Sequence, residues 1–419
     1  MTLDAASPEI ASAQRRAIGT LSTGQVFSGI AVAGSIPAGG LIAASVSGSE
    51  AAAGLAQTFG VLGAAVLALP LARVALSRGR RPALALGYGL GAVGAVVVIV
   101  GAVARSLPVI LLGTFLVGVA SAASYQARYA ATDLARPDTV ARSLSWVVWA
   151  GTIGAVLGPN LLNASGRLGM ALGLPQLAGP YVVSGVCLAL AAVVLLLFLR
   201  PDPYLTALRL RGEAGAAKKA RLRDGLEHLR SRPQAVFGIA VISIGHLVMV
   251  MVMVMTPVHM AHVDVSLQLI GLVISVHVAG MYALSPLVGW SVDRFGRLAV
   301  VFAGIAILVA SCAIAGTAPA DSTVQLGIGL FLLGLGWSCT LIAGSAIVTE
   351  ATDAAERPSV QGLSDLSMNA AGAVGGAVAG VVVAVGSYGW LCAVAVLPLV
   401  ALAVVAFRRV ASRSNTRSI

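Results

Sequence analysis

Long apolar runs, separated by short polar segments, recur along the whole chain. Twelve of them are bounded by charged residues or by Gly and Pro, and most have about the ~20 residues that a helix needs to cross a bilayer. We place them at 18–46, 51–73, 83–104, 108–128, 143–165, 179–199, 235–258, 267–290, 298–317, 323–349, 360–384 and 390–407. The pattern therefore predicts an all-α membrane protein with twelve transmembrane helices.

Composition supports this class. Of the 419 residues, 58% are hydrophobic and only 10% are charged, whereas a soluble domain has roughly 25% charged residues. Such a chain has too little polar surface to face water on all sides. The four cysteines all lie within apolar runs, so they indicate no disulfide framework.

The positive charge is sorted by side of the membrane. If both termini are inside, all Lys and Arg residues except Arg105 and Arg167 lie at inner segments. This follows the positive-inside rule, so it predicts cytoplasmic termini and a multi-pass protein of the bacterial inner membrane. The net charge of +11 is thereby explained without a nucleic-acid partner.

The same assignment divides the chain into five parts. They are a cytoplasmic N-terminus (1–17), a six-helix bundle (18–199), a cytoplasmic basic linker (200–234), a second six-helix bundle (235–407) and a cytoplasmic tail (408–419). The linker has two interpretations. It is either an amphipathic basic helix on the anionic inner leaflet or a solvated connection whose charges fix the topology.

An internal repeat relates the two bundles. With a shift of 216 residues, Pro70 aligns with Pro286, Arg78 with Arg294 and Arg81 with Arg297, and after the fourth span the shift becomes 219. Two parallel six-helix halves joined by a charged loop are a known transporter architecture, with substrate bound near the midplane between the halves. We therefore expect two pseudo-symmetric bundles and transport by alternating access.

The segment GWSVDRFGR at 289–297 resembles the loop motif that follows the second and eighth spans of the major facilitator superfamily. The resemblance implies a gating role for Gly289, Asp293, Arg294, Gly296 and Arg297. A carboxylate here favours the positive N-terminal end of a neighbouring helix, and the arginines offer donors to inner acidic groups. The alternative is a tight turn whose charges only set topology.

The first copy departs from this motif. It reads ALSRGRRP at 75–82, and Ser77 stands where the acid is expected. We therefore expect an asymmetric latch that is strong in the second half and weak in the first.

Part of the pattern of proton-coupled drug exporters is also present. Gly154, Gly158 and Pro159 resemble their fifth-span motif, in which glycines allow close helix approach and proline kinks the helix. The fourth span has Thr114 where these exporters usually carry a buried arginine. The resemblance to exporters is therefore incomplete.

The seventh and eighth spans carry a second pattern. His246, Met249 and Met253 share one helix face, and so do His277 and Met281. At ~1.5 Å per residue, Met249 and His277 have similar depths, so the two faces are expected to meet near the midplane. Thioether sulfur and imidazole suit soft ions such as Cu(I).

This spacing resembles that of copper importers of the CcoA type within the same superfamily. The resemblance implies that Met249, Met253, His277 and Met281 bind copper as the transported substrate, with His259 and His262 as outer capture groups. Three interpretations stay open. The methionines serve packing or contact an organic substrate, the set binds metal, or His277 carries protons.

Asp365 is the one acid well inside a predicted span. A buried carboxylate binds a proton more readily than an exposed one, so Asp365 is a candidate proton carrier. Alternatively, the nearby helix N-terminus stabilises it. Arg128, at the inner end of the fourth span, is expected to snorkel to the interface. Candidate cavity-lining residues are Gln25, Tyr125, Gln126, Trp337 and Asn369.

Together these features predict a monomeric secondary transporter, coupled to protons, that exports a small organic compound. Copper import is the rival function, and a non-transporting membrane receptor or scaffold is the third class. The sequence has no nucleotide-binding loop or catalytic constellation, so we expect no enzymatic activity and no cofactor. The expected partners are the solute or ion, protons and the lipid bilayer.

Overall fold

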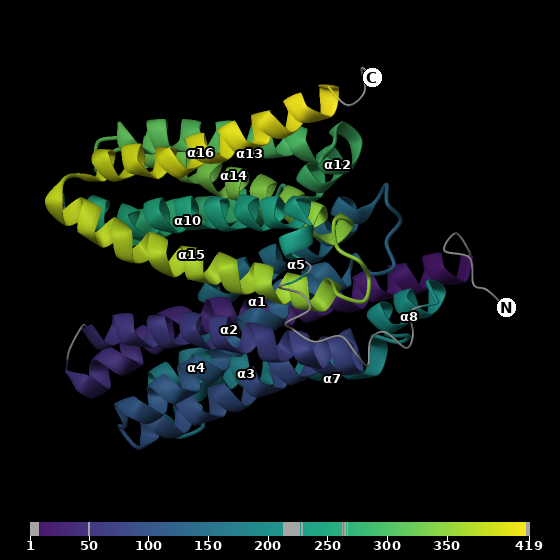
Figure 1. Cartoon of the computed structure of the whole chain (residues 1–419). Helices are drawn as coiled ribbons and strands as arrows, with labels where there is room; N and C mark the ends of the chain where they lie inside the picture. The colour runs from purple at the N-terminus through teal and green to yellow at the C-terminus, as the bar shows by residue number, and fades with distance from the viewer. Residues whose placement is uncertain are drawn as a thin grey trace. The chain divides into compact units, whose positions relative to one another are not determined.

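The structure is a computed structural model that describes residues 8–48, 51–212, 227, 229–261, 263, 265 and 267–415. In these residues, twelve helices are long and apolar enough to cross a membrane, and there is no strand. The prediction of an all-α membrane protein with twelve spans is therefore confirmed. Figure 1 shows the arrangement of helices along the chain.

The helices of the first half, including one short 3-10 helix, have the following bounds. They are α1 (Pro8–Ser47), α2 (Ala51–Arg78), α3 (Arg80–Val103), α4 (Leu107–Ala130), α5 (Val140–Asn160), α6 (Leu162–Ala171), η1 (Gln176–Ala178), α7 (Gly179–Phe198) and α8 (Pro203–Leu210). Those of the second half are α10 (Pro233–Ala261), α11 (Leu267–Tyr282), α12 (Ser285–Phe295), α13 (Arg297–Gly316), α14 (Thr323–Glu350), α15 (Arg357–Val385) and α16 (Tyr388–Asn415).

The eighth span is not one continuous helix. The sequence predicted a single run at 267–290, but α11 ends at Tyr282 and α12 begins at Ser285. Pro286 lies in the first turn of α12, where its missing N–H costs no helical hydrogen bond. The corresponding Pro70 lies inside α2 without ending it.

The chain forms two compact units. The first consists of Met1–Arg232 and Thr352–Leu366, and the second of Pro233–Ala351 and Ser367–Ile419. Helix α15 contributes to both. Its beginning packs in the first unit, although α15 lies far along the second half of the sequence.

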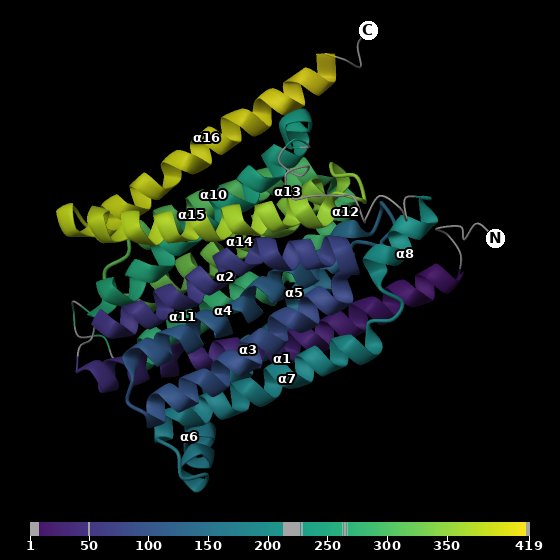
Figure 2. The same cartoon turned by 60° about the horizontal axis from the view of Figure 1, so that its bottom comes forward.

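In the first unit, α1 packs along α5 and α7, while α4 packs against α2 and α3 (Figure 2). The α1–α5 contact depends on glycine. A Cβ atom on Gly154 would lie 2.5 Å from the Cα of Gly29, and one on Gly158 would lie 2.7 Å from the backbone nitrogen of Gly34. The partial fifth-span motif thus lies where two helix backbones touch, as small residues allow in membrane proteins.

In the second unit, α14 is the central helix and packs against α10, α11 and α13. Glycine again sets the closest approaches. A Cβ on Gly334 would lie 2.7 Å from the backbone nitrogen of Met281, and one on Gly344 would lie 2.9 Å from the carbonyl oxygen of Gly238. Both units are therefore held by backbone-to-backbone packing of spans.

The outward-facing side chains are apolar. On α3, Val93, Val96 and Val100 are all exposed and share one face. On α16, Leu397, Val400 and Val404 are exposed in the same way. Exposed apolar bands of this kind are typical of helices that contact lipid.

We expect Gly154→Ala to destabilise the protein. The added methyl group would push α1 from α5, and overpacking of this kind costs about 1–3 kcal/mol. The matched control is Gly151→Ala, because a Cβ at Gly151 meets nothing within 4 Å. Thermal unfolding in detergent should show a lower Tm for Gly154→Ala alone. Equal Tm values for the two variants would contradict the proposed contact.

Candidate functional site

The turn between α12 and α13 holds the charged motif of the second unit. Gly296 has a φ of 93°, which is in the left-handed region that favours glycine. Arg297 follows it and donates from Nε to Oε1 of Glu350 at 2.8 Å, while its Nη2 lies 4.0 Å from Oδ1 of Asp293. Arg294 is exposed. The structure thus brings Asp293 and Arg297 together and adds Glu350, which ends α14.

The first unit contains the same arrangement. Gly79 has a φ of 95° and precedes Arg80, whose Nε donates to Oδ2 of Asp133 at 2.9 Å. Asp133 follows the end of α4, just as Glu350 ends α14. The three equivalent pairs, Gly79 with Gly296, Arg80 with Arg297 and Asp133 with Glu350, are each 217 residues apart.

Two expectations about this turn are wrong. The shift of 216 aligned Arg81 with Arg297, whereas the structural equivalent is Arg80. The expected weak latch in the first half is also contradicted. The side chains of Arg80 and Asp133 are each 1% exposed, whereas those of Arg297 and Glu350 are 21% and 37% exposed. The first ion pair is therefore the more buried one.

Asp202 supplies the carboxylate that the first copy lacks. Its Oδ2 accepts a hydrogen bond from the backbone N–H of Arg81 at 2.8 Å, and its Oδ1 accepts one from that of Leu205 at 3.1 Å. One side chain therefore caps the N-termini of both α3 and α8. The sequence signal is Asp202 followed by Pro203, a typical start of a helix.

Asp365 forms a buried ion pair with Arg128. Nη2 of Arg128 lies 2.7 Å from Oδ1 of Asp365, and the two side chains are 2% and 0% exposed. The guanidinium also lies over the rings of Tyr129 and Tyr125, 4.6 Å and 5.6 Å from their centroids. The expectation that Arg128 snorkels to the interface is therefore wrong, because a buried carboxylate holds it inside.

The beginning of α15 presents a polar face to α3 and α4 within the first unit. Gln361, Ser364 and Asp365 lie at i, i+3 and i+4, so they share one face. Gln361 accepts a hydrogen bond from Arg80, and the hydroxyls of Ser364 and Tyr129 are 3.1 Å apart. Arg80 thus connects the turn to α15.

In the second unit, His246 and Trp337 come together as part of a cluster. Nε1 of Trp337 donates to Nδ1 of His246 at 3.0 Å. The ring of Tyr282 meets that of Trp337 edge-on with a centroid distance of 5.8 Å. A Cβ on Gly372 would lie 2.8 Å from Cδ2 of His246, so α15 passes directly beside the imidazole. Asn369, one turn earlier on α15, is buried.

His277 is fully buried and is held by α14. Its Nδ1 lies 2.8 Å from the carbonyl oxygen of Leu330. A carbonyl only accepts, so Nδ1 carries the proton. Nε2 has no hydrogen-bond partner within the described part of the chain.

The three methionines proposed as copper ligands differ in burial. Met249 and Met281 are buried and Met253 is half-buried. Among the described residues, no three His, Cys, Asp or Glu side chains form a metal-binding group. A copper site would therefore need methionine sulfur beside His277.

Of the two outer histidines, the structure describes His259. The ring of His259 stacks on Tyr388 with a centroid distance of 4.3 Å, and its Nε2 lies 3.5 Å from the carbonyl oxygen of Ala318. His262 lies outside the described residues. The structure therefore places His259 in a contact between α10 and α16.

The side chains of Gln25, Gln126 and Thr114 each make a hydrogen bond. The side-chain oxygen of Gln25 accepts from the Tyr88 hydroxyl at 3.1 Å, and Gln126 donates to the carbonyl oxygen of Ala68 at 2.9 Å. Thr114 donates to the carbonyl oxygen of Leu111 in its own helix.

Known proteins resemble most of this chain. A family model described as Major Facilitator Superfamily matches residues 21–267 and 241–418. The chain is 36% identical over 394 residues to "Uncharacterized MFS-type transporter YddS" of Bacillus subtilis (strain 168), which covers 93% of this chain and 90% of that protein. It is 31% identical over 360 residues to "Riboflavin transporter RfnT" of Brucella anthropi, covering 85% and 86%.

Solved structures share the fold. A crystal structure of the human organic anion transporter MFSD10 matches with a TM-score of 0.71 at 16% identity, covering 93% of this chain and 98% of that one. The proton:xylose symporter XylE matches with a TM-score of 0.68 at 16% identity, covering 95% and 96%. At these identities the likeness concerns the fold alone.

We expect the two equivalent ion pairs to differ in strength. Asp133→Asn leaves the buried Arg80 without its counter-charge, and breaking a buried pair costs about 3–5 kcal/mol. Glu350→Gln breaks a partly exposed pair, for which about 0–1 kcal/mol is typical. Thermal unfolding of both variants in the same detergent tests this. A larger loss of stability in Glu350→Gln would contradict the burial difference.

Proposed function

The chain belongs to the major facilitator superfamily, and from this we propose that it is a proton-coupled transporter that exports a small organic compound. The buried Arg128–Asp365 pair is the observation that carries the proposal. It lies where α15 docks on α4, and the two side chains are 2% and 0% exposed, so neither charge faces solvent. Ionisable groups inside spans mark proton and substrate pathways by default.

The proposed coupling is electrostatic. Ionised Asp365 attracts Arg128 and holds the beginning of α15 on α4. When Asp365 binds a proton, the attraction is lost, and the contact depends on the weaker Tyr129–Ser364 and Arg80–Gln361 bonds. Because α15 contributes to both compact units, its docking is a step through which protonation can bias alternating access. Asp365 lies two turns into α15, and a helix dipole acts within about the first turn, so we disfavour the structural alternative.

An organic substrate is supported by two observations. One relative, at 31% identity, is named as a riboflavin transporter. In addition, His246, Trp337 and Tyr282 form an aromatic cluster that joins three helices of the second unit. Export is favoured by the resemblance of Gly154, Gly158 and Pro159 to drug/proton antiporters.

We further propose that the protein is a monomer in a bacterial inner membrane. Both termini lie in the cytoplasm in this proposal, because the Lys and Arg residues gather at the inner segments.

Copper import is the second candidate, and His277 favours it. Ligating histidines usually donate their other ring N–H to a carbonyl or carboxylate, which fixes the ring and the tautomer. His277 donates from Nδ1 to Leu330 and leaves Nε2 as a buried nitrogen that can bind a soft ion. Met281 lies one turn away on the same helix face. In this reading Cu(I) is the substrate.

We expect Asp365→Asn to abolish transport driven by a pH gradient, because the amide behaves as a permanently neutral acid. The assay is uptake into proteoliposomes of riboflavin and a panel of lipophilic organic cations. An antiporter should respond to an acidic interior, and a symporter to an acidic exterior. Exchange of substrate at equal pH should persist in the variant.

The matched control for this assay is Asp138→Asn. Asp138 pairs with Arg136, but the two side chains are 64% and 72% exposed, so transport should be unchanged. Full gradient-driven uptake by Asp365→Asn would rule out the proposed coupling. If neither Asp365→Asn nor Asp293→Asn changed the function of the protein in cells, a non-transporting receptor or scaffold would be favoured.

For the copper candidate, we expect deletion of the gene to lower cellular copper and His277→Ala to fail to restore it. Met251→Ala is the control, because Met251 is a buried methionine of α10 that belongs neither to the proposed copper set nor to its outer capture groups. Copper content is measured by elemental analysis of cells. Unchanged copper together with greater sensitivity to lipophilic compounds would exclude import and favour export.

A further inference from the structure

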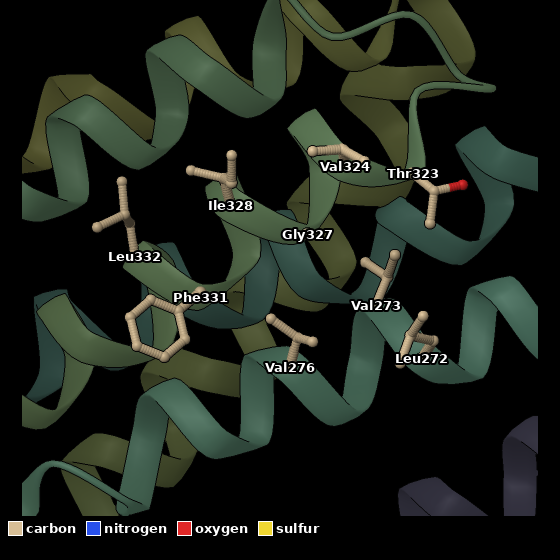
Figure 3. A pocket seen from close by; sticks show the side chains of 9 residues that line it. All are labelled: Leu272, Val273, Val276, Thr323, Val324, Gly327, Ile328, Phe331 and Leu332. Atoms are coloured by element: carbon tan, nitrogen blue, oxygen red, sulfur yellow. The ribbon is translucent and has the colours of Figure 1, made fainter.

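An apolar groove lies between α11 and α14 in the second unit (Figure 3). Its volume is about 380 Å³, and nine residues line it. The only heteroatom in their side chains is the hydroxyl of Thr323, which is the first residue of α14 and so lies at one end. Solute pockets of ~300–1,000 Å³ usually contain several polar groups that orient the ligand. This groove has none along its length.

The groove opens toward the outside of the unit. Leu326, Leu330 and Leu333 of α14 are fully buried, whereas Val324 and Ile328 are 76% and 52% exposed. With 3.6 residues per turn, the buried and exposed sets lie on opposite sides of the helix. Across the groove, Leu272 and Val276 project from α11 (Figure 3), and Leu272 is 54% exposed.

The length of the groove fits one leaflet. From Thr323 to Leu332, at ~1.5 Å per residue, it extends about 13 Å along α14. This is close to half of the ~30 Å hydrocarbon core of a bilayer. Since Thr323 begins the span, the groove runs from one membrane surface toward the midplane.

Hydrocarbon is the material that fills such a groove. Water would find no hydrogen-bond partners along it, and an empty space would forfeit dispersion contacts for every lining atom. Lipid tails are as apolar as leucine, and the exposed faces of both helices carry apolar side chains. We propose that the groove is a binding site for one acyl chain of a phospholipid from the leaflet at the Thr323 end.

Gly327 forms part of the groove's surface. A Cβ atom at this position would meet nothing within 4 Å, so the helix backbone itself faces the open space. A larger side chain at residue 327 would start in this open space and occupy volume assigned to the acyl chain. Phe331 lines the deeper part (Figure 3), and its removal would enlarge the site.

The test uses full-length protein in nanodiscs of phospholipid with a photoactivatable diazirine on one acyl chain. After illumination, mass spectrometry maps the adducts. We expect wild-type protein to carry more label on 272–276 and 323–332 than on the lipid-facing residues Val93, Val96 and Val100 of α3. Gly327→Leu should lose the groove label, and Phe331→Ala should gain it.

The matched control is Gly89→Leu, because a Cβ at Gly89 also meets nothing within 4 Å but lies on α3. It should leave groove labelling unchanged. Equal labelling of the groove and α3, or full groove labelling in Gly327→Leu, would overturn the proposal. The proposal would also be overturned if tetraphenylphosphonium displaced the label and unlabelled phospholipid did not. The groove would then be a site for a solute. Phe331→Ala keeps the test decisive if Gly327→Leu fails to fold.

Discussion

The absence of water inside the bilayer is the constraint on which this structure depends. A backbone amide or a charged side chain in hydrocarbon has no solvent to bond with, so the protein must satisfy it. The backbone does so by forming helices, and the side chains do so in pairs. Arg128 with Asp365 and Arg80 with Asp133 are the clearest cases, because all four side chains are almost completely buried.

Close helix packing follows from the same constraint. Lipid tails are as apolar as the helices, so association depends on close contact rather than on exclusion of water. Glycine permits that contact where α1 crosses α5 and where α11 crosses α14. Where two helices diverge instead, as α11 and α14 do near Thr323, a groove remains that hydrocarbon can fill.

The duplicated turn shows how one arrangement can be kept while its parts change. Both units use a left-handed glycine, an arginine that begins a helix and an acid at the end of the next span. The second unit adds Asp293 from α12, whereas the first takes Asp202 from the segment after α7. In the first unit Arg80 also binds Gln361, so this turn is connected to α15.

The sequence by itself determined the twelve spans and the repeat, and it singled out Asp293, Arg297 and Asp365 as candidates, because hydrophobic runs and isolated charges are local signals. It did not determine register or pairing. The alignment of the two halves matched Arg297 with Arg81 instead of Arg80, because the two arginines are adjacent and either one can be matched. Only the tertiary structure decided that Arg128 lies 2.7 Å from Asp365, 237 residues away. A partner at that separation is chosen by how helices pack, and no local pattern encodes it.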